Sequence, residues 1–362
     1  MLGLHLQIAI YSMQRNSTRI LVSIFTGILF PISILAEEKD SADHAPAGVT
    51  ADHYHAKGES MISLSYSFMK MQGNFLNGHH LNDEEIIQMT NPLSSAPPKL
   101  SIVPIRMLMP MVMFGGMHAI SDRITILGMG MFTSKDMSLN TYSSMMNRSH
   151  LGSFKVKNTE FSNISFSSLV KIHETESNRL HIELGLDKSI ASKNARGIIL
   201  TPMNTEMDMI LPYGMQGDGS LRWIGSLTNT KKFSQIIFGN QIRVKHTISS
   251  GQWNFGDTWE YTSWLQKPLN PHLSLSVRFH ALSQGGLEGK NPLINGPVQT
   301  ANPINYGGRL FNLGLGLNTI VPTPAFGEIR LGLEVLTPLK EDKKNLQMQD
   351  QFRAQIKLQK SF

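Results

Sequence analysis

Cysteine is absent from this 362-residue chain, so it can form no disulfide and offers no thiolate as a nucleophile or metal ligand. Charged residues make up only 17% of the chain, and its lysines and arginines are dispersed rather than gathered into blocks. The formal net charge of +6 therefore gives little support for a nucleic-acid partner, and we expect none. GxSxG, HExxH and glycine-rich phosphate-binding motifs are also missing, so we do not expect an enzyme.

Beyond the first 36 residues, no apolar run is long enough to form a membrane-spanning helix. At the amino terminus, Arg15 and Arg19 precede an apolar run over 20–35, and Ala36 is followed by three charged residues. Basic, apolar, small and then charged is the order of a secretory signal, so we predict that residues 1–36 are a signal peptide, with Met13 as the true start. An uncleaved helical anchor is the alternative, which Pro31 and the short run disfavour.

Residues 37–59 are small and polar, and we predict that they form a flexible periplasmic lead. Three histidines lie in this stretch: His44, His53 and His55. They are either solvated linker residues or ligands of a metal ion, and the run Asp52-His53-Tyr54-His55 is too short to decide between the two.

Apolar alternation at period two begins near residue 60 and continues to the end of the chain. In the last stretch, 350–362, Phe352, Ile356 and Leu358 fall on one face and charged residues on the other. The chain ends on Phe362, and a terminal aromatic closing such a strand looks like the signal read by the assembly machinery of outer-membrane barrels. Lys360 departs from that signal, which usually carries an apolar residue there.

The alternation predicts twelve strands, at about 60–71, 103–119, 123–134, 161–174, 179–191, 218–228, 233–247, 257–266, 272–283, 307–319, 327–337 and 350–362. Connections are long after odd strands and short after even ones. Outer-membrane barrels have this arrangement, with long external loops and short periplasmic turns. We therefore expect residues 60–362 to be an all-β, antiparallel up-and-down transmembrane barrel, in contact with lipid in the bacterial outer membrane.

Several stretches resemble a family of bacterial outer-membrane barrels described as phenol-degradation (MetA-pathway) or transporter proteins. The matching residues, at 58–71, 109–132, 211–220, 256–265 and 307–318, follow the family's order across nearly all of the mature chain. The resemblance implies a channel for small organic solutes, of aromatic or anionic character, and no catalytic residues.

If the apolar faces meet lipid, the opposite faces line the bore. That assignment places in the lumen Lys171, Arg243, Glu260, Arg278, His280, Arg309, Arg330 and Glu334. These charges either pair with one another and fill the barrel, or form a basic constriction that selects anionic or polar solutes. Twelve strands predict a narrow or partly plugged pore, since eight are filled by side chains and sixteen leave a wide channel.

Methionines are concentrated in the first predicted strands. Met107, Met109, Met111 and Met113 share one face, and Met69, Met71, Met129 and Met131 have the same bore-facing parity on neighbouring strands. They are either packing in irregular space or a soft-metal surface for copper(I), with His118 nearby. The copper-associated barrel is one alternative to the channel, and a structural barrel or an outer-membrane enzyme is another. Apart from copper, we expect no cofactor.

Overall fold

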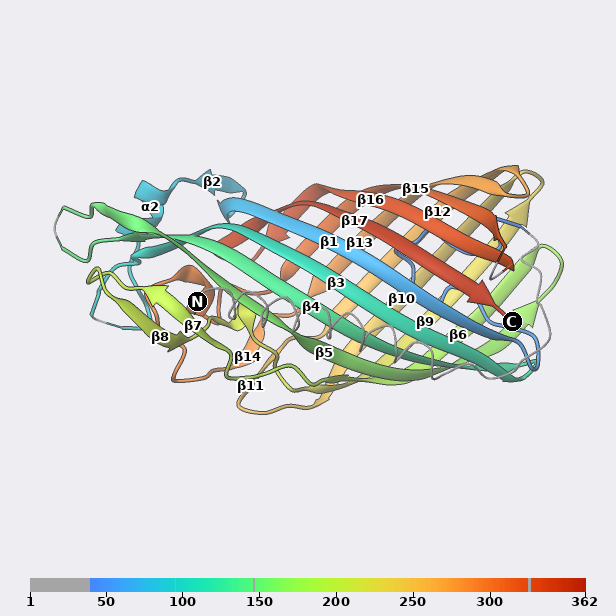
Figure 1. Ribbon diagram of the computed structural model, residues 1–362, viewed down its shortest axis with the longest axis horizontal. Helices are drawn as coiled ribbons and strands as arrows, with labels where there is room; N and C mark the ends of the chain where they lie inside the picture. Colours follow the sequence, from blue (N-terminus) through green and yellow to red (C-terminus); the bar gives the residue numbers. More distant parts are fainter. Residues whose placement is uncertain (1–39, 95, 146, 325–326) are drawn as a thin grey trace, which may run out of the picture. The chain divides into compact units, whose positions relative to one another are not determined.

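Twelve long antiparallel strands form the wall of a closed barrel in the computed structural model, which describes residues 40–94, 96–145, 147–324 and 327–362 (Figure 1). The wall strands are β1 (Ser60–Leu76), β3 (Ile102–Ser121), β4 (Ile124–Tyr142), β5 (His150–Glu174), β6 (Asn178–Ser189), β9 (Leu221–Phe233), β10 (Ile236–Ser249), β12 (Thr258–Asn270), β13 (Leu273–Gln284), β15 (Gly308–Thr323), β16 (Gly327–Lys343) and β17 (Gln347–Ser361).

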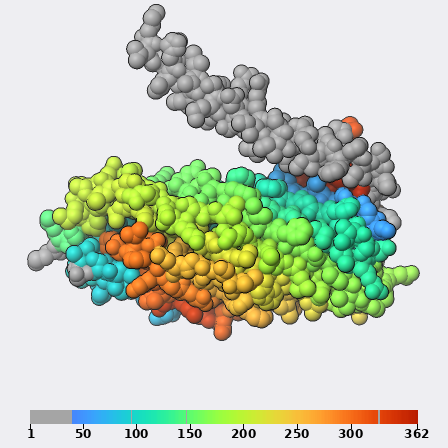
Figure 2. Space-filling view, turned by 90° about the horizontal axis from the view of Figure 1, so that it is seen from below, coloured from blue at the N-terminus to red at the C-terminus, as the bar shows by residue number. Residues whose placement is uncertain are grey.

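Each wall strand pairs with the next one along the chain, and β17 pairs with β1, from Met61 opposite Ser361 to Phe75 opposite Gln347. The predicted all-β, up-and-down barrel of twelve strands is therefore confirmed. In the space-filling view, green, yellow and orange segments follow one another across the visible face, as sequential pairing requires (Figure 2). Among the described residues, no helix is long and apolar enough to cross a membrane.

The period-two pattern separates an apolar outer face from a polar inner one. In β6, Leu184 and Leu186 are 56% and 49% exposed, whereas Glu183 and Asp187, which flank them, are buried. Phe166, Leu315 and Val335 repeat the outward pattern on other strands. A closed barrel with such an outer face satisfies its backbone internally and presents hydrocarbon to lipid, so it lies in the bacterial outer membrane.

The connections differ between the two ends of the barrel. At one end the strands are joined by short turns, at 122–123, 175–177, 234–235 and 271–272 and between Thr323 and Gly327. At the other end the connections are 77–101, 143–149, 190–220, 250–257, 285–307 and 344–346, and most of them are longer. The last of these is short, so the predicted alternation fails at 344–346. The polar stretch 135–160 was expected to be a loop, but it is largely strand. β4 and β5 stay paired through most of it, as far as Tyr142 opposite His150.

Short elements gather in the connections of the long-loop end: β2 (His79–Leu81), α2 (Asp83–Gln88), β7 (Arg196–Leu200), β8 (Glu206–Ile210), η1 (Tyr213–Met215), β11 (Trp253–Phe255), β14 (Leu287–Gly289) and η2 (Gln299–Ala301). Loop residues Tyr213, Trp253 and Val298 form one buried cluster with the inward wall residues Met107 and Met137. The long loops therefore fold into this end of the barrel.

Residues 40–59, called the plug from here on, lie inside the other end. Backbone hydrogen bonds at both ends of the plug join it to the wall near the short turns. The Ser41 N–H donates to the Pro271 carbonyl, and the Gly58 N–H donates to the Ala119 carbonyl. In place of the flexible lead expected for 37–59, the described part is mostly buried within the wall. The predicted signal peptide, residues 1–36, lies outside the described residues.

Candidate functional site in the barrel interior

The plug is held by side chains from many strands of the inner wall. Long amides reach its backbone: Gln241 Nε2 donates to the Thr50 carbonyl at 3.0 Å, and Gln355 Nε2 to that of Ala47 at 3.0 Å. Arg330 donates to the carbonyls of Ser41 and Asp40 at 2.6 and 2.7 Å. Because this segment forms no ladder of its own, these side chains satisfy backbone groups that burial would otherwise leave costly.

An ion pair between Arg278 of β13 and Glu334 of β16 contacts the plug. The Arg278 guanidinium contacts Glu334 twice, from Nε to Oε1 at 2.7 Å and from Nη2 to Oε2 at 2.9 Å. Both side chains are almost fully buried. Glu334 also accepts from the Gly48 N–H at 2.9 Å, so the pair fastens the plug to β16. Bidentate, charge-assisted bonds of this kind are among the strongest in proteins.

A second network lies on β5, β6, β9 and β10. Arg243 Nη2 is 3.0 Å from Glu183 Oε1, and the hydroxyls of Ser167 and Ser226 donate to the same carboxylate. Lys245 lies 3.5 Å from Asp187. These contacts fit the reading of the bore charges as a mutually compensating network, since each buried carboxylate has a basic partner.

The remaining predicted bore residues divide into those that face inward and one that does not. His280 Nε2 is 3.7 Å from Glu260 Oε2, and Lys171 lies over the Tyr54 ring of the plug. Arg309 is exposed and pairs with Ser283, on the parity of the outward Phe311 and Leu313. Its assignment to the bore is therefore wrong, because alternate residues of a strand point to opposite faces and Arg309 has the outward parity that Leu313 and Leu315 share.

The methionines occupy the predicted inner face. Met109 pairs with Met69, Met107 with Met71, and Met113 with Met131, so their side chains are neighbours on the wall. His118 has the opposite parity: it is exposed, and its Nδ1 is 2.9 Å from the Ser60 hydroxyl on the outer side. The expectation that His118 joins the methionine patch is wrong, because alternate residues of a strand point to opposite faces.

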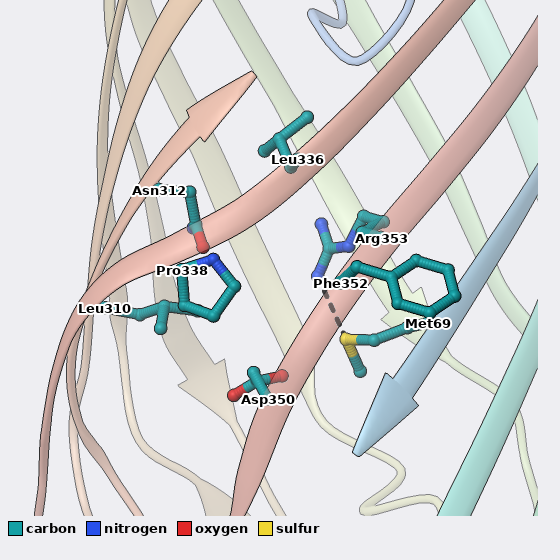
Figure 3. A pocket seen from close by; sticks show the side chains of 8 residues that line it. All are labelled: Met69, Leu310, Asn312, Leu336, Pro338, Asp350, Phe352 and Arg353. Atoms are coloured by element: carbon teal, nitrogen blue, oxygen red, sulfur yellow. Dashed lines mark hydrogen bonds between the residues drawn. The ribbon is translucent and has the colours of Figure 1, made fainter. Parts of the chain in front are cut away.

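The wall is incompletely paired between β16 and β17. These strands pair only from Arg330–Leu336 with Arg353–Gln359, and beyond Leu336 they separate, β16 staying with β15 and β17 with β1 (Figure 3). A small pocket of about 20 Å³, open to solvent, lies at the separation. It is lined by Met69, Leu310, Asn312, Leu336, Pro338, Asp350, Phe352 and Arg353.

The lining of this pocket crosses the wall from inside to outside. Arg353 points inward and donates to the Met69 sulfur at 3.4 Å, whereas the Phe352 ring lies 6.0 Å from Phe68 on the outer parity. The pocket therefore offers an apolar surface and one guanidinium. Sequence reasoning missed it, because strand periodicity predicts where strands run but not how far two of them stay paired.

A polar cluster occurs within the plug. His44, Asp52 and His53 each offer a ligand atom, and these atoms lie within 4.8 Å of one another. Burial and the nearby Arg330 charge hold the pKa of His44 well below its usual range. Burial alone would raise the pKa of Asp52, but His53 and Lys357 outweigh it and hold that pKa well below its usual range. At neutral pH the imidazole is thus uncharged and the carboxylate ionised.

The sequence does contain an indication of the plug, in the amide side chains at inward-facing positions of the strands. Gln241, Gln266, Asn318 and Gln355 carry long amides on the bore face, and all four donate to plug carbonyls. Amides in such a series indicate a buried backbone to be satisfied, whereas the plug's own small and polar composition is that of a linker.

No protein-family model matches the chain, and no curated protein matches it. Among solved structures, it is similar to an outer-membrane channel from Pseudomonas putida F1, with 11% identity, a TM-score of 0.53, and coverage of 86% of this chain and 98% of that one. The P. putida toluene transporter TodX aligns with 8% identity and a TM-score of 0.42, over 85% of this chain and 91% of that one. The first likeness shows a shared fold; the second is too low to support an argument.

Proposed function

We propose that the chain is an outer-membrane channel for small organic solutes, which enter or leave the narrow, charged lumen at the separation of β16 and β17. The observation that carries the proposal is the pocket at this point, with apolar residues from both sides of the wall and Arg353 on the inner side. The plug and the inward-folded loops narrow the two ends of the bore, so a lateral pocket is the least obstructed way in.

The composition of the pocket favours solutes with an apolar body and an anionic end. Phe352, Leu310 and Pro338 provide apolar contact, and the Arg353 guanidinium can form a bidentate pair with a carboxylate. Asp350 lies in the same pocket and is paired with Lys343 Nζ, which leaves the Arg353 guanidinium as the group there that can take an anion. An aromatic carboxylate matches this arrangement better than a neutral sugar does.

Because the chain has no cysteine, a cross-link can test the route without background thiols. Continuing the β16–β17 register places Thr337 opposite Phe352, so Thr337→Cys with Phe352→Cys, joined by oxidation or a short bis-maleimide, would hold the separation closed. We expect uptake of an aromatic carboxylate into proteoliposomes to fall at least fivefold, and reduction of the disulfide to restore it.

The matched control is Leu333→Cys with Ile356→Cys, a pair on the same outward face where the strands are already joined. This cross-link should leave uptake unchanged. Equal uptake by both cross-linked proteins and the parent would overturn the lateral route. Equal uptake of a sugar, an aliphatic carboxylate and an aromatic carboxylate would overturn the solute class.

A copper(I)-associated barrel is the second candidate function, favoured by the register of the inward methionines. Thioethers favour copper(I), although flexible packing accounts for the same residues. Titrating copper(I) into the detergent-folded protein, with and without leucine at Met107, Met109, Met111 and Met113, separates the two. Equal binding by both proteins would leave these residues as packing.

A further inference from the structure

The plug folds back on itself so that residues distant in sequence meet. Ala45 N–H donates to Asp52 Oδ2 at 2.8 Å, and Val49 N–H donates to the Pro46 carbonyl within the intervening turn. The rings of His44 and His53 lie 3.8 Å apart between centroids, and that of His55 lies 4.9 Å from His53. The side chains of His44, Asp52, His53 and His55 are all at least nine-tenths buried.

Hydrogen bonding leaves part of this cluster unsatisfied. Nε2 of His53 and Nε2 of His55 are buried with no hydrogen-bond partner among the residues that the structure describes. A buried polar atom without a partner destabilises the fold. Asp52 Oδ2 is held by the Ala45 N–H, while Oδ1 faces His53 Nδ1 at 3.1 Å. One carboxylate oxygen is thus oriented by the backbone and the other is turned toward the imidazoles.

We propose that His44, Asp52 and His53 bind a divalent transition-metal ion inside the plug. Two imidazoles and a carboxylate are donors that zinc takes, at about 2.0–2.2 Å, and tetrahedral geometry puts these ligand atoms about 3.4 Å apart. The atoms of this site, within 4.8 Å of one another, need to close by at most about 1.4 Å. The hydrogen bond from the Ala45 N–H to Asp52 Oδ2 leaves Oδ1 for the metal and is the kind of support that orients a metal ligand.

An adjacent cavity leaves room for a further ligand. It has a volume of about 40 Å³, is partly open to solvent, and is lined by Asp52 and His53 together with Met61, Met113 and Met129. Lys357 Nζ lies 4.0 Å from Asp52 Oδ1 and competes with a cation for that oxygen. Bound metal would tie residue 44 to residues 52–53 and so fix the fold of the plug within the bore.

Zinc titration of the intact, folded barrel, carrying no histidine tag and read by competition with a zinc indicator, tests the site. We expect one zinc per barrel, with affinity at least 100-fold lower in His44→Ala with His53→Ala. The control, His79→Ala with His80→Ala, removes two exposed histidines of β2 and should change affinity less than twofold. Lys357→Met should raise affinity severalfold, because it removes the competing charge.

Equal zinc affinity in the parent and the His44/His53 variant would overturn the proposal, as would loss of binding in the His79/His80 variant instead. If the His44/His53 variant does not fold, copper(II) bound to the parent protein provides the second readout. Its electron paramagnetic resonance spectrum should show coupling to imidazole nitrogens, and Asp52→Asn, which removes the carboxylate ligand, should weaken copper(II) binding. A spectrum without nitrogen coupling would also overturn the proposal. None of these results depends on which solute the channel carries.

Discussion

At the scale of single residues, the buried pair of Arg278 and Glu334 is the most consequential contact of the bore. Removing one partner of a buried ion pair leaves the other charge uncompensated, at a cost of about 3–5 kcal/mol. We therefore expect Arg278→Ala to lower the free energy of unfolding by that amount, measured by urea titration of the detergent-folded barrel. Replacing both, as Arg278→Met with Glu334→Leu, should cost less, because no charge is left unpaired.

Arg309→Ala is the control for this experiment. The same residue type on the neighbouring strand is exposed on the outer parity, so its loss should change the free energy of unfolding by no more than about 0.5 kcal/mol. Equal destabilisation by the two alanine variants would mean that the Arg278 contacts contribute no more than an exposed arginine does.

Parity also sets the limit of residue-level prediction from the sequence. Along β10, β13 and β16 the alternation is regular, and Arg243, Arg278, Arg330 and Glu334 face inward as predicted. Arg309 and His118 were misplaced although the alternation of their own strands predicts both: Arg309 has the parity of the outward Leu313, and His118 is an odd number of positions from Met113. A shift of one position moves a side chain to the other face of the wall, so grouping residues by nearness along the chain assigns some to the wrong side.

At the scale of elements, the strands and short turns followed from period two, whereas the plug did not. A strand carries its own pattern, but the plug is held by amides and a guanidinium contributed by five wall strands, β10, β12, β15, β16 and β17. Its residues, among which alanine is the commonest, are mostly small or polar, so they can fill the bore and are equally suited to a linker. Only the inward Gln and Asn positions distinguish the two.

The plug and the inward-folded loops act as two constrictions in series. Removing residues 40–59 should raise single-channel conductance in planar bilayers, but only modestly, because the loop cluster around Tyr213 and Trp253 still narrows the other end. Adding Tyr213→Ala and Trp253→Ala to the deletion should raise conductance more than either change alone. A full rise from the deletion alone would show that the loops do not limit flow.

At the scale of the whole molecule, the barrel wall has one weak seam. β4 and β5 pair from Ile124 opposite Val170 to Tyr142 opposite His150, along nearly their whole length. β16 and β17 pair only over Arg330–Leu336, although both strands continue well beyond it. Closure of the barrel at β1–β17 is long by comparison, so the chain ends are well joined and the weakness lies one strand away.

Local opening should therefore begin at this seam, because segments with fewer ladder bonds open at lower free energy. We expect amides of 337–343 and 347–352 to exchange with deuterium faster than those of β4 and β5 in lipid nanodiscs, followed by mass spectrometry. The Leu333→Cys with Ile356→Cys cross-link, which anchors the paired part, should slow exchange there only slightly, whereas joining residues 337 and 352 should protect both segments strongly. Uniform exchange along all wall strands would mean that the separation is a fixed feature of the wall rather than a place where it opens. In that case solutes would have to pass through a pocket of constant width.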